Sequence, residues 1–395
     1  MDFKLIIISP TQTHPATAGN RVRILNFVER LKKLYDVDIY FLYVDLDGEV
    51  TPDTIDYWGD RLNVYHSLKD MSSPKTRTLV DRIKLRMGLI SYEKWDYNFH
   101  IDECFDDGIL AVCRDLFAKF NFEIVLTEYV FMTKAFQAFP SKVKKILDTH
   151  DRFSNRFEIY PVVNGRRPYR WFSTYPEDEK KALNRADAII AIQDEEAKSF
   201  RKMTNRKVVT VGHLFDDSFA EETTHFKGES VLFFASDNVI NVDAYHFFTQ
   251  EVWPLVVKQL PTCKFVVAGR ICRVIEPVDG IVFLGEVTDK LEAYECASIS
   301  INPMLYGSGL KIKTLESLTM GIPVVSTAHG AIGLEEMIDQ SIFVASDAAT
   351  FCDNIVNLLT DKRFYSQVEQ SLRSCLIDYQ QRNNEVILDL FNPIV

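Results

Sequence analysis

Short apolar runs that end in polar residues recur along the chain and predict buried strands. The first is "KLIIIS" at Lys4–Ser9, which is apolar on both faces, as strands of a parallel sheet are. A polar loop follows, then "RVRILNFVERLKKL" with apolar residues at helical spacing, then a second strand, "DVDIYFLYV". This order is the βαβ unit of a parallel sheet. Further runs of the same kind lie at Glu123–Tyr129, Val143–Asp151 and Ala186–Gln193.

The pattern pauses in a polar, acidic stretch from His213 to Ser230 and then begins again. The second series contains the expected strands "SVLFFAS", "CKFVVAGR", "IVFLGEV", "SISINPM", "PVVST" and "SIFVAS", and one long expected helix, "NVDAYHFFTQEVWPLVVKQL". Two successive series predict an α/β protein with two Rossmann-like domains whose parallel sheets face one another across a cleft. We expect the first domain at 1–212 and the second at 213–375. A C-terminal helix at 376–395 is expected to pack back on the first domain.

Composition agrees with this division and narrows the function. A chain of 395 residues is longer than one domain with a single hydrophobic core usually is, so two domains are expected. A net charge of -11 argues against wholesale nucleic-acid binding. The 7 cysteines are scattered without C-x-x-C spacing, so reduced thiols in a cytoplasmic protein are expected. The apolar run near the N-terminus is too short for a signal peptide or a membrane span.

The second series contains a candidate anion site in "YGSGLKIKTLESL". Gly307 and Gly309 allow the backbone to approach a ligand closely. The helix expected from about Leu310 offers free N–H groups and a positive dipole end. Lys311 and Lys313 add charge that suits a diphosphate.

Glu316 lies one to two turns into this expected helix, where a carboxylate can accept hydrogen bonds from both hydroxyls of a ribose. Gly321 and Pro323 end the helix and lead into the next strand. The simpler alternative is a glycine-rich turn before an ordinary amphipathic helix.

The same stretch resembles the donor-binding half of the group 1 (GT4-type) glycosyltransferases of the GT-B fold. Those enzymes carry a Gly-rich loop, a helix with a ribose-binding Glu, and then "G-x-P-V-V". The resemblance covers Val231–Glu335 well and the N-terminal half loosely. It implies a nucleotide-sugar donor, transfer with retention of configuration, and no metal or other cofactor.

Carried over residue by residue, the resemblance implies a donor site made by Gly19, Arg270, Gly307, Ser308, Gly309, Leu310, Lys311, Lys313 and Glu316. Two features depart from the family. Ser308 stands where many members have a first Glu, and the loop "ASDNVIN" lacks the Arg and Lys that many members place there. Gly19 is alternatively a simple loop glycine, and Arg270 a solvated surface arginine.

His150 and Asp151 follow a strand of the first domain, and related enzymes often place such residues near the transferred sugar. With Lys313 they are the candidate catalytic residues. Glu128, at the end of "IVLTEY", is a further candidate. The alternative for His150 and Asp151 is a turn that caps the next helix. No D-x-D motif has a context that suits a metal–diphosphate complex.

Two basic stretches suggest partners. Residues 75–87 form an expected amphipathic helix that could lie on anionic lipid or simply be solvated. The loop at Asn164–Pro176 is rich in Arg and aromatic residues. Its aromatic residues are expected either to line an acceptor site or simply to anchor the loop on the protein.

The expected protein is a cytoplasmic hexosyltransferase that uses a glycan or lipid-linked glycan acceptor. The usual setting of the resemblance is bacterial lipopolysaccharide or capsule synthesis at the inner face of the membrane. Two other functions stay open: a nucleotide-sugar epimerase of the same fold, and a non-catalytic glycosyltransferase-like binding subunit.

Overall fold

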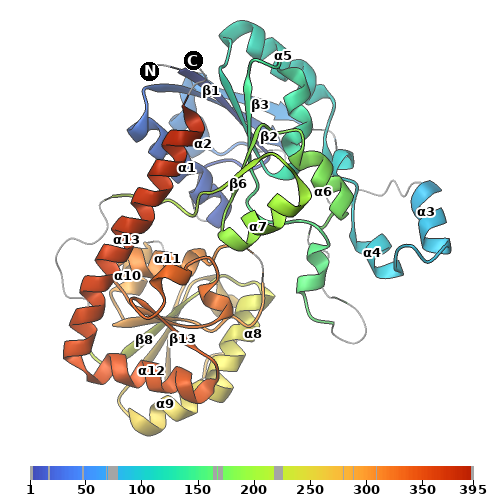
Figure 1. The fold of residues 1–395 in the computed structure, drawn as a ribbon. Coiled ribbons are helices and arrows are strands. Elements are labelled where there is room, and N and C mark those ends of the chain that lie inside the picture. Colours follow the sequence, from blue (N-terminus) through green and yellow to red (C-terminus); the bar gives the residue numbers. More distant parts are fainter. Residues whose placement is uncertain are drawn as a thin grey trace. The chain divides into compact units, whose positions relative to one another are not determined.

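The computed structural model describes residues 3–16, 18–46, 49–67, 69, 79–162, 167, 172–217, 226–278, 280–287, 289–307 and 309–392. The chain forms two compact units, and each is a parallel sheet covered by helices (Figure 1). The first unit comprises Met1–Leu214 and Asn383–Val395, and the second comprises Phe215–Arg382. The break between them lies two residues beyond the domain boundary expected after residue 212.

The sheet of the first unit has 7 parallel strands in the order β3-β2-β1-β4-β5-β6-β7. They are β1 (Phe3–Ser9), β2 (Val37–Asp45), β3 (Leu62–His66), β4 (Ile124–Glu128), β5 (Lys144–Asp148), β6 (Ala188–Ala191) and β7 (Lys207–Thr210). Ile6 of β1 pairs with Tyr40 on one side and with Val125 on the other. The order reverses between β1 and β4.

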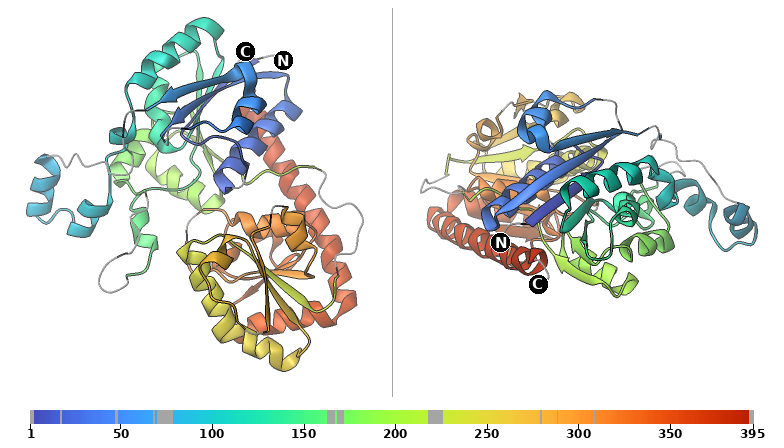
Figure 2. Two further views of the ribbon diagram at one scale, coloured as in Figure 1. Left: turned by 180° about the vertical axis from the view of Figure 1, so that it is seen from behind. Right: turned by 90° about the horizontal axis from the view of Figure 1, so that it is seen from above.

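The α-helices of this unit connect successive strands, except for two that extend away from the sheet. They are α1 (Gly19–Leu34), α2 (Pro52–Trp58), α3 (Leu79–Arg86), α4 (Tyr92–Tyr97), α5 (Gly108–Phe120), α6 (Pro176–Leu183) and α7 (Asp194–Met203). Short 3-10 turns are η1 (Gly59–Arg61), η2 (Ile101–Cys104), η3 (Val130–Ala138) and η4 (Arg156–Ile159). Both views in Figure 2 show α3 and α4 standing away from the layers that cover the sheet.

The sheet of the second unit has 6 parallel strands in the order β10-β9-β8-β11-β12-β13, which reverses between β8 and β11. The strands are β8 (Ser230–Phe234), β9 (Lys264–Ala268), β10 (Ile281–Gly285), β11 (Ile299–Asn302), β12 (Val324–Thr327) and β13 (Ile342–Ala345). The α-helices are α8 (Val239–Phe247), α9 (Trp253–Gln259), α10 (Lys290–Tyr294), α11 (Ile312–Thr319), α12 (Ala348–Thr360) and α13 (Lys362–Phe391). The 3-10 turns are η6 (Arg270–Arg273), η7 (His329–Ala331) and η8 (Glu335–Met337).

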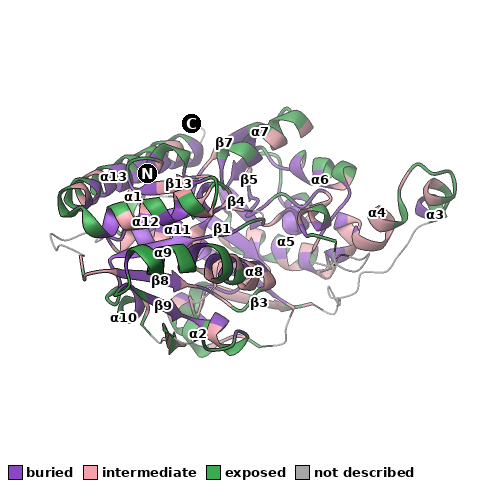
Figure 3. Cartoon of the chain, turned by 90° about the horizontal axis from the view of Figure 1, so that it is seen from below, coloured by how far each residue is buried: buried purple, intermediate pink, exposed green. Residues whose placement is uncertain are grey.

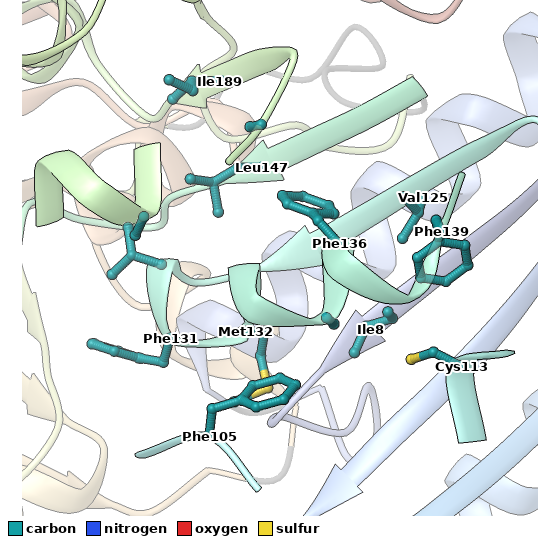
Figure 4. Packing of buried hydrophobic residues seen from close by; sticks show 14 of the residues in the cluster. Ile8, Phe105, Cys113, Val125, Phe131, Met132, Phe136, Phe139, Leu147 and Ile189 are labelled. Carbon is teal, nitrogen blue, oxygen red and sulfur yellow. The ribbon is translucent and has the colours of Figure 1, made fainter. Parts of the chain in front are cut away.

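The central strands of both sheets are buried on both faces, which explains their continuous apolar runs (Figure 3). Along β1, Ile6 and Ile8 pack on one face with α5 and η3, while Leu5 and Ile7 pack on the other with α1 and the end of α13. The first of these layers is drawn in Figure 4, where four adjacent strands contribute Ile8, Val125, Leu147 and Ile189.

Two expected helices differ from the structure. The helix expected over 241–260 is divided by a π-helical segment, η5 (Phe248–Val252), because Pro254 has no N–H to donate into the helical ladder. The C-terminal helix expected to begin at residue 376 begins at Lys362 and is 30 residues long. Its residues after Arg382 belong to the first unit.

Parallel α/β sheets bind ligands beyond the carboxyl ends of their strands, where the strand order reverses. In the second unit this edge carries the loops that follow β8 and β11. In the first unit it carries the loops that follow β1 and β4. Nearly all candidate residues lie on these loops or on the loops of neighbouring strands.

Candidate functional site

The loop after β11 has the open backbone that its glycines predict. Gly307 has φ 130° and Gly309 has φ 73°, values that residues with a side chain rarely adopt. A Cβ on Gly307 would lie 3.2 Å from Met304 Cε and 3.3 Å from Ile240 Cδ1. The loop therefore requires glycine for its conformation and for its packing. Ser308 lies outside the described residues.

The loop leads into α11, whose first turn suits an anion. No side chain caps the helix among the described residues, and no acidic residue lies in the first turn. Lys311, at the N-cap position, is buried, with its Nζ 3.4 Å from the Gly307 carbonyl oxygen. The positive end of the helix dipole and a buried ammonium thus meet at one place, although the Ile312 and Thr314 N–H groups donate to the Leu310 and Lys311 carbonyl oxygens.

Lys313 adds a second positive group on the first turn. Its Nζ donates a hydrogen bond to Asn241 Oδ1 and lies 5.3 Å from the centre of the Phe233 ring. Burial, with a further contribution from the charge of Lys311, lowers the pKa of Lys313 to about 7. A diphosphate placed here would lie close to the positive charges of these two lysines.

Glu316, the expected ribose ligand, is paired within the second unit. Its Oε1 accepts a hydrogen bond from Lys290 Nζ at the start of α10. Burial raises the pKa of Tyr294 well above its ordinary value, and the Glu316 carboxylate adds to this effect. A ribose would have to share the carboxylate with Lys290, a residue that the sequence did not single out.

Arg270 follows β9 as expected, but its side chain is exposed, with Nε 3.5 Å from Asp237 Oδ1. Gly269, with φ 96°, makes the turn possible, because a Cβ there would lie 2.4 Å from the Ala235 carbonyl oxygen. This glycine brings the ends of β8 and β9 close together. The charge of Arg270 is partly offset by Asp237.

His329 was missed by the sequence analysis. Its Nε2 lies 2.6 Å from the Gly307 carbonyl oxygen and therefore donates its proton to that oxygen. Burial and the charge of Lys311 lower the pKa of His329 below its ordinary value. The only signal in the sequence was its place just after β12, at the same sheet edge.

In the first unit, Gly19 is the first residue of α1, and Ala18 is its N-cap. No side chain caps this helix among the described residues, and its first turn has no acidic residue. The turn glycine expected here thus begins a helix, and within its first turn the Asn20 Oδ1 accepts a hydrogen bond from the Arg21 N–H at 2.9 Å.

His150 lies at the carboxyl edge of the first sheet, in contact with two residues from the end of β4. Its Nε2 is 2.5 Å from Glu128 Oε2, and its ring stacks on Tyr129 with centroids 4.1 Å apart. His150 and Tyr129 have φ of 60° and 67°, a strained conformation that clusters at functional sites. Burial raises the pKa of Glu128, and the imidazole opposes this effect.

Asp148 lies beside this pair but is held by Arg23. The guanidinium contacts both Asp148 oxygens, at 2.8 and 2.9 Å, and donates to the Gly212 carbonyl oxygen at 2.8 Å. Glu128, Asp148 and His150 offer ligand atoms within 4.8 Å of one another, the spacing of a metal site. A cation at all three would have to compete with Arg23, whose charge already offsets that of Asp148.

Asp151 is occupied by structural contacts. Its carboxylate pairs with Arg156 at 2.5 Å and accepts from the Arg152 N–H at 2.8 Å. Burial raises the pKa of Glu196 well above its ordinary value, and the adjacent Asp151 charge adds to this. Most of the loop expected at Asn164–Pro176 lies outside the described residues.

Comparison with known proteins finds similarity in sequence and in fold. Residues 228–361 match the family model "Glycosyl transferases group 1". A relative from Klebsiella pneumoniae, an uncharacterized 44.6 kDa protein in cps region, is 25% identical over 385 residues, which are 90% of each chain.

Two solved structures share the fold over nearly the whole chain. TarM covers 99% of this chain and of its own, with 13% identity and a TM-score of 0.68. Sucrose-phosphate synthase from Thermosynechococcus elongatus covers 98% of each chain, with 14% identity and a TM-score of 0.63. A mutant of S. aureus TarM, also 13% identical, was solved in complex with fondaparinux, alpha-GlcNAc-glycerol and UDP.

Proposed function

Because residues 228–361 match the family model of the group 1 glycosyltransferases and the chain has the GT-B fold, we propose that it transfers a hexose from a nucleotide-diphosphate donor. The acceptor is a glycan or a lipid-linked glycan, and the anomeric configuration is retained. The proposed setting is bacterial surface polysaccharide synthesis. The relative encoded in a cps region supports this setting.

The observation that carries the proposal is the start of α11. Two glycines with positive φ, an uncapped helix and two lysines meet there, at the point where the sheet order reverses. This combination suits a diphosphate better than a neutral ligand or a simple carboxylate. The UDP complex of the TarM mutant supports the same ligand class.

In the proposed mechanism, Lys311, Lys313 and the positive end of the α11 dipole stabilise the charge that develops on the leaving diphosphate. Preorganised charge of this kind is usually the largest contribution to catalysis. Glu316 holds the ribose once Lys290 shares or releases its carboxylate. His150, oriented by Glu128, contacts the transferred sugar. Retention rests on the family resemblance.

A lipid-linked acceptor would be met at a membrane surface, and we propose that the protein works at the inner face of the membrane. None of the described helices has both the length and the apolar character needed to cross a bilayer.

The test is calorimetry with UDP and GDP, together with transfer assays, on Lys313→Ala and Glu316→Ala. We expect each variant to bind the nucleotide at least about tenfold more weakly, as the loss of one charge-assisted contact implies. Lys264→Ala, at the opposite edge of the same sheet, is the matched control and should bind like the unmodified protein. Full affinity in both site variants would show that the site is misassigned.

A second candidate is a non-catalytic glycosyltransferase-like subunit. The pairing of Glu316 with Lys290 and of Arg270 with Asp237 favours it, since both expected donor ligands have partners already. Such a subunit would bind neither UDP nor GDP. An epimerase, in contrast, would convert a nucleotide sugar with no acceptor present.

A further inference from the structure

Exposed apolar side chains gather on α3 and the turn that follows it. Leu79 is 73% exposed, Met87 68% and Leu89 67%. Leu79, Ile83 and Met87 are four residues apart and therefore share one helical stripe. The helical path reaches Met87, whose N–H donates to the Ile83 carbonyl oxygen at 2.9 Å. We call this the α3 surface; its apolar members are Leu79, Val80, Ile83, Met87, Leu89 and Tyr92.

Around the α3 surface the basic side chains are exposed, whereas the nearby acidic side chains are buried or paired. Arg82 and Arg86 are exposed beside the apolar stripe. The acidic residue of the helix, Asp81, is buried and lies 2.9 Å from His100 Nε2. Glu93 of α4 is paired with Arg167 at 2.6 Å. The surface is thus apolar and basic on a chain whose net charge is -11.

The orientation of the helix is fixed by α6. His100 bridges the two elements, with Nε2 on Asp81 and Nδ1 on Asp178 at 2.6 Å. Lys84 Nζ lies 3.6 Å from Glu177 Oε1, a second link to α6. These contacts hold the acidic residue inward, while Leu79, Ile83 and Met87 stay exposed.

We propose that the α3 surface docks this protein on an anionic phospholipid bilayer. The apolar side chains enter the boundary between headgroups and acyl chains, and Arg82 and Arg86 contact the lipid phosphates. A protein partner would need a complementary shape, whereas a bilayer accepts a convex apolar stripe flanked by cations. The net charge of the chain is acidic, so anionic lipid favours contact through a basic surface such as this one. Lys75 and Arg77, in the basic stretch expected at 75–87, lie outside the described residues.

The test measures binding of the full chain to vesicles of phosphatidylglycerol and phosphatidylcholine, compared with vesicles of phosphatidylcholine alone. We expect binding to the anionic vesicles to be at least tenfold tighter and to be weakened by 0.5 M salt, which screens charge over about 4 Å. Ile83→Glu and Met87→Glu should each reduce this binding at least tenfold. Arg82→Gln with Arg86→Gln should remove most of the preference for anionic lipid.

A matched control separates docking from general loss of apolar surface. Ile55, on α2, is 49% exposed, and so is Ile83. Ile55→Glu should leave vesicle binding unchanged. Equal binding by Ile83→Glu and the unmodified protein, or no preference for anionic vesicles, would overturn the proposal. So would a dimer in analytical ultracentrifugation that Ile83→Glu dissolves, because the surface would then bind a second copy.

The docking proposal does not rest on the proposed donor chemistry. Failure of docking can therefore be distinguished from failure of the proposed function. Ile83→Glu should keep its UDP affinity within twofold, since α3 belongs to the other unit. Loss of vesicle binding with UDP binding intact supports docking alone. UDP binding absent from the unmodified protein would overturn the proposed function and leave the docking result standing.

Discussion

At the residue scale, Lys313 makes donor binding depend on pH. Its pKa of about 7 means that the side chain loses its charge as the pH rises through 7. A diphosphate binds the protonated form, so UDP affinity should fall roughly tenfold between about pH 7.5 and 9. Calorimetry in buffers of different ionisation enthalpy should also detect proton uptake on binding.

Lys313→Arg provides the control, because a guanidinium stays charged over this whole range. Its UDP affinity should be nearly independent of pH. A pH dependence that persists unchanged in the arginine variant would assign the titration to another group.

Glu128 is expected to act through His150. Glu128→Gln keeps the shape of the side chain but removes the charge that orients the ring. We expect kcat to fall by about 10²-fold with KM for the donor little changed, the scale of general acid–base and positioning effects. Steady-state kinetics separates the two constants. A rise in KM with kcat intact would mean that Glu128 serves binding instead.

The candidate α11 site could be proposed from the sequence because its glycines, lysines and glutamate are close together in the chain. The sequence did not reveal Lys290 or His329, whose contacts with Glu316 and Gly307 depend on how loops from separate strands meet. It also did not show that Arg23 holds Asp148, a contact across 125 residues. Side-chain pairs of this kind leave no local pattern.

At the element scale, the turn after β9 depends on one glycine. Gly269→Ala combines a positive φ with a Cβ 2.4 Å from a backbone oxygen, so we expect a loss of about 3–5 kcal/mol in unfolding free energy. Gly285→Ala shares the positive φ but has nothing within 4 Å, so about 1–2 kcal/mol is expected. Urea unfolding followed by fluorescence and circular dichroism compares them. Equal losses would mean that the close approach relaxes.

Strands in the middle of each sheet were predicted well because both of their faces are buried. The edge strands β3 and β7 were missed, since their residues are mostly half-buried or exposed and their apolar pattern is weak. The turn η3 was missed as well, although most of its residues are buried. Its apolar residues follow neither a helical nor a strand period over enough positions to be recognised.

At the scale of the whole molecule, α13 contributes to the core of both units. Leu390 is 1% exposed in the core of the first unit, while Leu388 on the same helix is 44% exposed. Leu390→Ala should therefore cost about 2–5 kcal/mol in that unit, and Leu388→Ala no more than about 0.5 kcal/mol. Hydrogen exchange of the β1 and β2 amides reports on this unit by itself. Similar exchange in both variants would show that the end of α13 does not stabilise the sheet.

The division into two units followed from the polar stretch between the two series of strands. The end of the second unit could not be predicted in the same way, because no Gly or Pro interrupts α13. The local sequence therefore does not mark the residue at which the helix passes from one unit to the other. Membership in a unit is decided by burial of Ile387, Leu390 and Phe391 against a distant sheet. Only the tertiary structure contains that information.

The bridge made by His100 has a mechanical consequence. Hydrogen bonds to Asp178 and Asp81 raise the pKa of the imidazole to about 9, so the bridge is complete at neutral pH and is lost only as the pH rises through about 9. The orientation of the projecting helix α3 is consequently fixed before it meets a lipid surface. Because the helix does not have to be ordered on binding, the entropic cost of membrane binding is small. Above about pH 9, where the imidazolium loses its charge, the helix should become more mobile.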